Sequence, residues 1–422
     1  MSWPVDLLYF LLVVITAPAW VIRMIRSGKI RTDWPGRFGR TIALPPSPGK
    51  RLLIHGVSVG EINAIRLLVD RMREERPDLQ IVISTTTDTG FARARDLFAT
   101  KHVVVRYPFD FSLCVRGFLD AVHPDVVALV ELEVWPNFTA ACSQRDIPVC
   151  IINGRLTERS FRRYQLIRPL VRPSFGRLAF TAVQSETYAR RFRELGVKTE
   201  NLHVSGTMKW DTAEIADVVE GADRLAREMG IDRSRPLIVA GSTAPGEHEL
   251  LVKAVPDCVQ LLCAPRKPEW FDQAARSLPG CARRSKGQGN SSTDRFLLDT
   301  IGELRMAYSL ADIVVIGRSF GHLHGSDMME PVALGKAVIV GPAISDFQQT
   351  MDALLEGDGI VQVTPETLSD VIHELLDNKD RRQQLAENGR KVILAHQGAT
   401  LRHAELICSL LENDRVESRS VT

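Results

Sequence analysis

Two predicted β-strands of this sequence lead directly into glutamates, a residue type that can accept a proton in catalysis. Glu61 closes the segment HGVSVGE (55–61), which follows an apolar run and opens a predicted helix. A carboxylate in the first helical turn is stabilised in its ionised form by the helix dipole and the free backbone N–H groups. This placement suits a general base, and the alternative is an ordinary helix-start glutamate. His55, at the end of the strand, is interpreted as structural.

The second acidic strand end is VVALVELEVWPN (126–137), a run that is apolar until it reaches Glu131 and Glu133. Residues two apart project from one face of a strand, roughly 6.5–7 Å from each other, if the strand continues that far. Carboxylates at the end of an apolar strand are costly to bury unless they are paired or functional. The alternative is that salt bridges to neighbouring basic residues satisfy them.

Three further residues follow predicted strands or open helices and could bind a phosphorylated sugar. Lys209, in GTMKWD (206–211), lies at the predicted domain junction and could hold a phosphate or a sugar carboxylate. Arg266 directly follows a strand, where its guanidinium group could bind a phosphate through two hydrogen bonds. Glu330 opens a helix and could accept hydrogen bonds from ribose hydroxyls. None of the three is specific by itself, and each could be an ordinary surface residue.

A basic segment, residues 152–177, carries seven arginines against one glutamate. A solvated basic face is the usual explanation for such a run. Here apolar residues are interleaved with the arginines, which favours a surface for anionic lipid head groups or lipid phosphates. We expect Arg159, Arg162 and Arg163 to contribute to that surface.

From residue 50 onward, short apolar runs alternate with stretches predicted to be helical. Apolar strands separated by helices predict parallel sheets covered by helices on both faces. The pattern restarts after a polar passage (211–230), predicted to be helical, so the economical interpretation is two Rossmann-like halves. In open α/β sheets a ligand lies outside the carboxyl ends of the strands, where the residues above are placed.

The N-terminal residues have the pattern of a membrane anchor. The stretch Leu7–Ile22 contains no charged residue, although Pro18 interrupts it and a helix of that length is short for a bilayer. Arg23, Arg26, Lys29 and Arg31 follow, and by the positive-inside rule they keep the later chain cytoplasmic. The alternative is a buried N-terminal helix.

Composition excludes several other classes of protein. The 422 residues suffice for two or three domains, and the formal net charge of +2 argues against a general nucleic-acid binder. The seven cysteines show no CxxC or Cys/His ligand spacing, so neither a zinc site nor a disulfide framework is expected.

Taken together and in order, the motifs resemble the Kdo (3-deoxy-D-manno-octulosonic acid) transferase family of lipopolysaccharide biosynthesis. The resemblance runs from RFGR (37–40) to GPAISDF (341–347). Between them it includes HGVSVGE, STTTDTG, YPFD, VELEVWPN, NGRLTERS, VQSE, GTMKWD, STAPGEHELL, APRKPE, DTIGEL and EPVALGK.

The resemblance implies a metal-independent, cofactor-free glycosyltransferase that moves Kdo from CMP-Kdo to a lipid A precursor with inversion. It implies a GT-B fold, in which two Rossmann-like domains face a central cleft. Residues 31–212 would form the acceptor-binding domain and residues 213–422 the nucleotide-sugar-binding domain, after an anchor at 1–30. The last helix could pack back on the N-terminal domain. The location implied is the inner membrane, with the catalytic domains on the cytoplasmic side and no nucleic-acid partner.

The same resemblance assigns roles to individual residues. Glu61 would be the general base, and Glu131 and Lys209 would support the transition state. The CMP-binding set would be Pro265, Arg266, Ile301, Gly302, Glu303, Asp327, Met328, Met329 and Glu330.

The chain departs from the usual family pattern near its predicted donor site. It reads HGSDMMEP (324–331) where GGHNPLEP is usual, Arg318 where glycine is usual, and Ile301 where methionine is common. The alternatives are a GT-B transferase that uses another nucleotide sugar on a membrane lipid, and a non-catalytic lipid-binding homologue.

Overall fold

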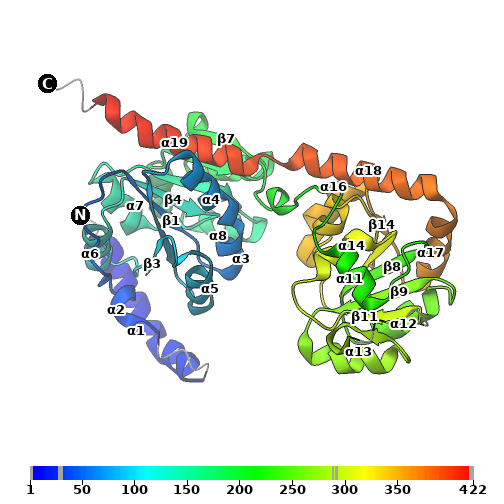
Figure 1. The fold of residues 1–422 in the computed structure, drawn as a ribbon. Coiled ribbons are helices and arrows are strands. Elements are labelled where there is room, and N and C mark those ends of the chain that lie inside the picture. The colour runs from blue at the N-terminus through cyan, green and yellow to red at the C-terminus, as the bar shows by residue number, and fades with distance from the viewer. Residues whose placement is uncertain (1–2, 27–31, 288, 290–292, 418–422) are drawn as a thin grey trace. The chain divides into compact units, whose positions relative to one another are not determined.

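The computed structural model describes residues 3–26, 32–287, 289 and 293–417. The chain divides into two compact units, residues 1–212 with 397–422 and residues 213–396. Each is built on a parallel sheet with helices on both faces, which confirms the α/β architecture predicted from the alternating pattern (Figure 1).

The first unit contains a seven-stranded sheet in the order β3-β2-β1-β4-β5-β6-β7. Its strands are β1 Arg51–His55, β2 Gln80–Thr85, β3 Val103–Arg106, β4 Val126–Val130, β5 Val149–Gly154, β6 Phe180–Val183 and β7 Leu202–Val204. Its helices are α1 Trp3–Arg26, α2 Trp34–Arg37, α3 Val59–Ala64, α4 Arg66–Glu75, α5 Asp88–Phe98, α6 Ser112–Val122, α7 Pro136–Ser143, α8 Glu158–Leu166, α9 Arg168–Phe175, α10 Glu186–Leu195 and α19 Ala399–Glu417, with 3-10 turns at Thr199–Asn201 and Trp210–Thr212.

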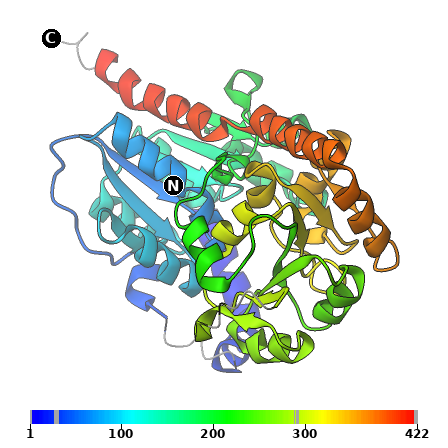
Figure 2. The same ribbon diagram turned by 45° about the vertical axis from the view of Figure 1, so that its right-hand side comes forward.

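Both faces of the first sheet are covered because the central residues of its strands are apolar on both sides. Along β1, Leu53 faces one hydrophobic cluster while Leu52 and Ile54 face the other, as the period of two requires. The C-terminal helix α19 completes the second cluster with Ala404 and Ile407. Figures 1 and 2 show α19 lying alongside α4 on that side of the first unit.

The second unit repeats this plan with the order β10-β11-β9-β8-β12-β13-β14. Its strands are β8 Leu237–Thr243, β9 Gln260–Pro265, β10 Ala282–Arg283, β11 Arg295–Leu297, β12 Ile313–Ile316, β13 Ala337–Val340 and β14 Val361–Gln362. Its helices are α11 Ala222–Met229, α12 Glu247–Ala254, α13 Phe271–Ser277, α14 Leu304–Leu310, α15 Met329–Ala333, α16 Gln348–Glu356, α17 Leu368–Asp377 and α18 Lys379–His396, with 3-10 turns at Pro268–Trp270, Arg284–Lys286 and Ser345–Phe347.

The polar passage 211–230 is less helical than predicted. Beyond the short turn at Trp210–Thr212, only α11 is helical there, starting after Gly221, whose φ is 85°. The physical reason is burial: α11 alone in this passage places apolar residues on one face, and these are buried, whereas Val218 is 83% exposed. A short helix without a buried face is not stable on its own.

Helix α1 contains the predicted anchor stretch and exposes most of its apolar side chains, including Phe10 and Ile15. Its N-terminal end is fastened to the first unit, since Asp6 accepts hydrogen bonds from Ser112 N (3.0 Å) and Asn137 Nδ2 (2.8 Å). Across the described chain, no helix combines the length and hydropathy needed to cross a membrane. Lys29 and Arg31 of the predicted basic flank lie outside the described residues.

Candidate active site

Charged residues from several strand ends gather at the carboxyl edge of the first sheet. Strands β1, β4 and β5 are neighbours, so the residues that follow them meet at one edge. Burial raises the pKa of Glu131, the nearby Glu61 carboxylate raises it further, and the charges of Arg155 and Lys209 lower it. The structure therefore brings together the three residues that the sequence predicts to be catalytic, and it adds Arg155.

Glu61 is held by reciprocal hydrogen bonds at the start of α3. Its N–H donates to Ser58 Oγ (3.3 Å), while Val57 N and Ser58 Oγ each donate to its carboxylate at 2.8 Å. This is a variant of the capping box, in which the carboxylate accepts from Val57 N and the Ser58 hydroxyl, so the helix-start interpretation holds as well. Because each carboxylate oxygen accepts a single one of these bonds, a second lone pair on each is available for a hydroxyl group.

Glu131 adopts a left-handed backbone conformation with φ 59° immediately after β4. The condition for Glu131 and Glu133 to project from one face of a strand is therefore not met, because β4 ends at Val130 and the chain turns. Such a conformation is unfavourable for a residue with a Cβ atom, and strain of this kind concentrates at functional sites.

Glu133 is half-buried next to the same group of charges. Burial, together with the charges of Glu61 and Glu131, raises its pKa from 4.5 to about 7, although a hydrogen bond from Trp135 Nε1 (2.8 Å) acts in the opposite direction. A carboxyl group with that pKa can hold or release a proton near neutral pH.

Lys209 is exposed, but the backbone on each side of it is fixed. Met208 N donates to Asn153 Oδ1 at 3.2 Å, and the N–H of Asn153 donates to the buried His403 Nε2 at 2.7 Å. After Lys209, the Asp211 carboxylate accepts hydrogen bonds from two backbone N–H groups at the start of α19. Sequence reasoning missed these supports. The one local signal in the sequence was a polar residue, Asn153, near the end of the apolar run that forms β5.

His55 is buried and stacks on Tyr107 with ring centroids 3.7 Å apart. Its Nδ1 lies 3.0 Å from Ser84 Oγ, and burial lowers its pKa to about 3. The ring is therefore neutral and belongs to the interior of the first unit.

The basic segment forms α8 and α9, with Arg159, Arg162 and Arg163 exposed on α8. Arg162 pairs with Glu158 at 2.9 Å. Among the interleaved apolar residues, Phe161 is buried in the core, whereas Leu166 is 84% exposed. The exposed surface of these helices is thus basic and apolar together.

In the second unit, a comparable gathering surrounds the hydroxyl group of Tyr308, whose pKa is raised by burial and by the charges of Glu330 and Asp327 and lowered by Arg266. A Cβ atom on Gly241, at the end of β8, would lie 2.0 Å from this hydroxyl, so glycine is needed there. Arg266, the residue after β9, therefore lies within electrostatic range of the same hydroxyl group as Asp327 and Glu330.

Other residues of the predicted donor set are placed differently. The side chains of Met328 and Met329 are buried, at 0% and 4% exposure, so only their backbone can meet a ligand. Pro265 is buried at the end of β9. The Glu303 carboxylate is engaged by Arg284 (2.9 Å) and Thr300.

Next to Glu303, the remaining members of the set are more accessible. Ile301 is 72% exposed, and Gly302 has φ 95°. Glu330 faces Arg305 at 3.6 Å.

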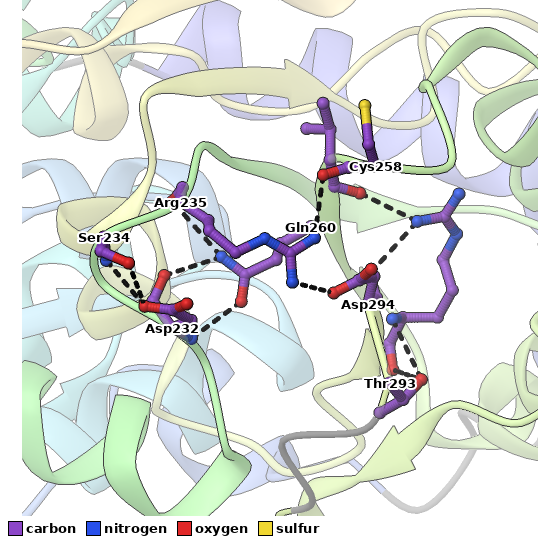
Figure 3. A network of polar contacts seen from close by, with 9 residues as sticks. Asp232, Ser234, Arg235, Cys258, Gln260, Thr293 and Asp294 are labelled. Carbon is purple, nitrogen blue, oxygen red and sulfur yellow. Dashed lines mark hydrogen bonds and ion pairs between the residues drawn. The ribbon is translucent and has the colours of Figure 1, made fainter.

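Figure 3 shows a polar network at the opposite edge of the second sheet, where strands begin. Arg235 Nη1 donates to Asp294 at 2.6 Å, and Gln260 bridges the backbone of Asp232 and Arg235. These groups satisfy one another and fasten the starts of β8, β9 and β11. The network is structural.

Left-handed backbone conformations occur near several strand ends of both units. Of the eight non-glycine residues with positive φ among the described residues, four lie at or near strand ends: Glu131, Asn153, Ser242 and Arg318. Such conformations are unfavourable for residues other than glycine and are commonest where function requires them. Sequence patterns do not reveal them.

Comparison with known proteins gives consistent results. Residues 32–212 match the family model described as 3-Deoxy-D-manno-octulosonic-acid transferase (kdotransferase). The chain is 30% identical over 406 residues to the 3-deoxy-D-manno-octulosonic acid transferase of Haemophilus influenzae, covering 92% of this chain and 94% of that one. It is 30% identical over 410 residues to the Bordetella pertussis protein of the same name, covering 91% and 94%.

Solved structures agree in fold. A glycosyltransferase from Rickettsia africae aligns with TM-score 0.56 and 12% identity, covering 87% of this chain and all 100% of that one. Anabaena HepE in complex with UDP aligns with TM-score 0.54 and 13% identity, covering 85% and 100%. At such identities the likeness concerns the fold alone.

Proposed function

The chain belongs to the 3-deoxy-D-manno-octulosonic acid (Kdo) transferase family, and we propose that it transfers Kdo from CMP-Kdo to a lipid A precursor with inversion of configuration. Its two parallel-sheet units have the architecture of GT-B glycosyltransferases. The observation that carries the proposal is the gathering of Glu61, Glu131 and Lys209 at one sheet edge.

In this mechanism Glu61 removes the proton from the acceptor hydroxyl as that oxygen attacks the anomeric carbon, while the bond between that carbon and the phosphate oxygen breaks and CMP leaves. Its capping-box bonds fix the carboxylate without occupying every lone pair, which suits a base that must be positioned before substrate arrives. Glu131 stabilises the positive charge that develops at the ketose centre. Lys209 offsets negative charge on the sugar carboxylate or phosphate.

The second unit binds the donor in this proposal. Arg266 contacts the phosphate, and Glu330 accepts hydrogen bonds from the ribose hydroxyls. Their common proximity to the Tyr308 hydroxyl supports this assignment. Ile301, Gly302 and the backbone of 327–329 complete the nucleotide contacts.

We assign the acceptor and the membrane to surfaces of the first unit. The exposed arginines of α8 bind the phosphates of the lipid acceptor, and the exposed apolar residues of α1 associate with the inner membrane from its cytoplasmic side. An anionic acceptor with acyl chains requires both kinds of surface.

The experiment is an assay of purified protein with CMP-Kdo generated in situ and a tetraacylated lipid A precursor, comparing wild type with Glu61→Gln. Glutamine preserves the capping box but accepts no proton, so turnover should fall by a factor of about 10²–10⁴. CMP affinity and melting temperature should hardly change.

The matched control is Asp370→Asn, which alters an exposed acidic residue in the first turn of α17. It should leave turnover unchanged. Near-normal turnover of Glu61→Gln would remove Glu61 as the base and leave Glu131 or Glu133 as the next candidate. Wild-type protein that prefers UDP to CMP in thermal-shift assays would instead indicate a different donor.

A further inference from the structure

Arg318 has a backbone conformation that its residue type disfavours. It lies two residues after β12 with φ 60°, in the left-handed region where glycine has no steric penalty and other residues do. In this chain an arginine therefore occupies the position at a cost in stability. Strain of this kind persists where the surrounding contacts over-determine it, and it is commonest at functional sites.

The surrounding contacts do over-determine it. The buried carboxylate of Glu247 accepts hydrogen bonds from Arg318 N (2.8 Å), Phe320 N (3.1 Å) and Ala244 N (2.8 Å). A Cβ atom on the preceding Gly317 would lie 2.4 Å from the Cα of Thr243. Glu247 thus fixes the chain at Arg318 tightly against the turn that follows β8.

The Arg318 side chain is half-buried and only partly satisfied. In the part of the chain that the structure describes, its guanidinium donates one hydrogen bond, from Nη2 to Leu323 O at 2.9 Å, and forms no ion pair. Most of its five N–H donors are therefore available. The hydrogen bond to Leu323 O lies at the exposed surface, so the remaining donors of the guanidinium are accessible to an anionic ligand.

Sheet topology places a second arginine nearby. The order β9-β8-β12 puts Arg266, after β9, and Arg318, after β12, on either side of the end of β8. Neighbouring strands are about 4.8 Å apart, so the two strand ends are separated by roughly 10 Å, a gap that two arginine side chains can close around one oxyanion.

A buried hydroxyl group near this point also lacks a partner. Ser326 follows Gly325, whose N–H donates to Arg318 O at 2.9 Å, and the Ser326 side chain is only 5% exposed. Its Oγ has no hydrogen-bond partner within the described residues. Buried polar atoms are normally paired, so this hydroxyl group also indicates that a polar ligand belongs here.

We propose that Arg318 and Arg266 together bind one oxyanion of the sugar-nucleotide donor, either its phosphoryl group or its sugar carboxylate. The proposal rests on the assignment of the donor to the second unit and adds Arg318 as a binding residue. Glu247 is a positioning residue, because it acts through the backbone of Arg318.

The test is Arg318→Gly, with binding of CMP and of cytidine measured by calorimetry and KM measured for CMP-Kdo. Glycine removes the guanidinium and also relieves the backbone strain, so poor folding is not expected. The melting transition of the second unit should rise by about 2–4 °C. If the phosphoryl group is the ligand, the Kd for CMP should increase about tenfold or more while the Kd for cytidine stays constant.

The control is His123→Gly, which relieves a similar left-handed residue, φ 46°, at the C-terminus of α6 in the first unit. It should leave both Kd values unchanged. A constant Kd for CMP with a raised KM for CMP-Kdo would identify the sugar carboxylate as the oxyanion.

Two results would overturn the proposal in distinguishable ways. If Arg266→Ala weakens CMP binding while Arg318→Gly changes neither the Kd for CMP nor the KM for CMP-Kdo, the donor site stands and the role of Arg318 is refuted. If wild-type protein does not bind CMP, the donor assignment itself fails, and Arg318 fails with it.

Discussion

Replacing Asp211 by asparagine should weaken the attachment of the C-terminal helix to the segment GTMKWD. The Asp211 carboxylate accepts two hydrogen bonds. Gly398 N donates to Oδ1 at 2.6 Å, and Thr400 N donates to Oδ2 at 2.5 Å. Both N–H groups belong to the start of α19, which has no partner for them within the helix. Asparagine has the same shape but only one acceptor oxygen, so one of these N–H groups must face an NH₂ group.

The magnitude follows from this geometry. A hydrogen bond to a charged group contributes about 1.5–3 kcal/mol, and the partial exposure of Asp211 favours the lower part of that range. Losing one bond and weakening the other should therefore destabilise the first unit by about 2 kcal/mol. For a domain of this size, that corresponds to a fall of about 4–8 °C in melting temperature.

The assay combines thermal unfolding with steady-state kinetics. Because Lys209 lies in the same loop, kcat should fall while CMP affinity is maintained. Asp217→Asn is the control: it breaks an exposed ion pair with Arg390 (2.6 Å), which should contribute less than about 1 kcal/mol. If Asp211→Asn and Asp217→Asn shift the melting temperature equally, the fastening of α19 by Asp211 is not what stabilises this loop.

Three further outcomes are expected. The folded state binds the Glu133 proton more tightly than the unfolded state, so the contribution of Glu133 to stability is complete below pH 4.5 and is lost as pH rises through about 7. In Glu133→Gln, the free energy of unfolding should therefore fall by about 1–3 kcal/mol less over this pH range than in wild type, as measured by urea unfolding at several pH values. The same pH dependence in both proteins would contradict the burial argument. Changing Arg159, Arg162 and Arg163 to glutamine should raise the KM for the lipid acceptor and not the Kd for CMP, whereas an unchanged KM would make the segment a solvated face. Deleting residues 1–22 should release the protein from membranes, and continued sedimentation at high salt would show that other surfaces dominate.

Much of the fold could be predicted because its determinants are local. A run such as RLLIH is apolar on both faces, so it specifies a strand buried on both sides of a parallel sheet, and the restart of the pattern specifies a second sheet. Strand-end residues such as Glu61 and Arg266 could be selected as candidates for the same reason, since parallel strands expose their carboxyl ends at a common edge.

Other features depend on contacts that no local pattern encodes. The hydrogen bond from Asn153 N to His403 Nε2 joins residues 250 positions apart, and neither residue type indicates which partner it has. The turn at Glu131 also required the structure, because nothing in the acidic run VELE indicates that the chain leaves the strand at Val130. The buried side chains of Met328 and Met329 likewise became apparent only once α15 was packed against its neighbours.

The sequence by itself determined which residue types stand at the strand ends, and hence the class of chemistry that they can perform. The tertiary structure decided which of them meet, how far each pKa is shifted and which backbone positions are strained. The physical reason is that periodicity and turn chemistry act over a few residues. Burial and charge interactions instead depend on distances in space, which packing alone establishes.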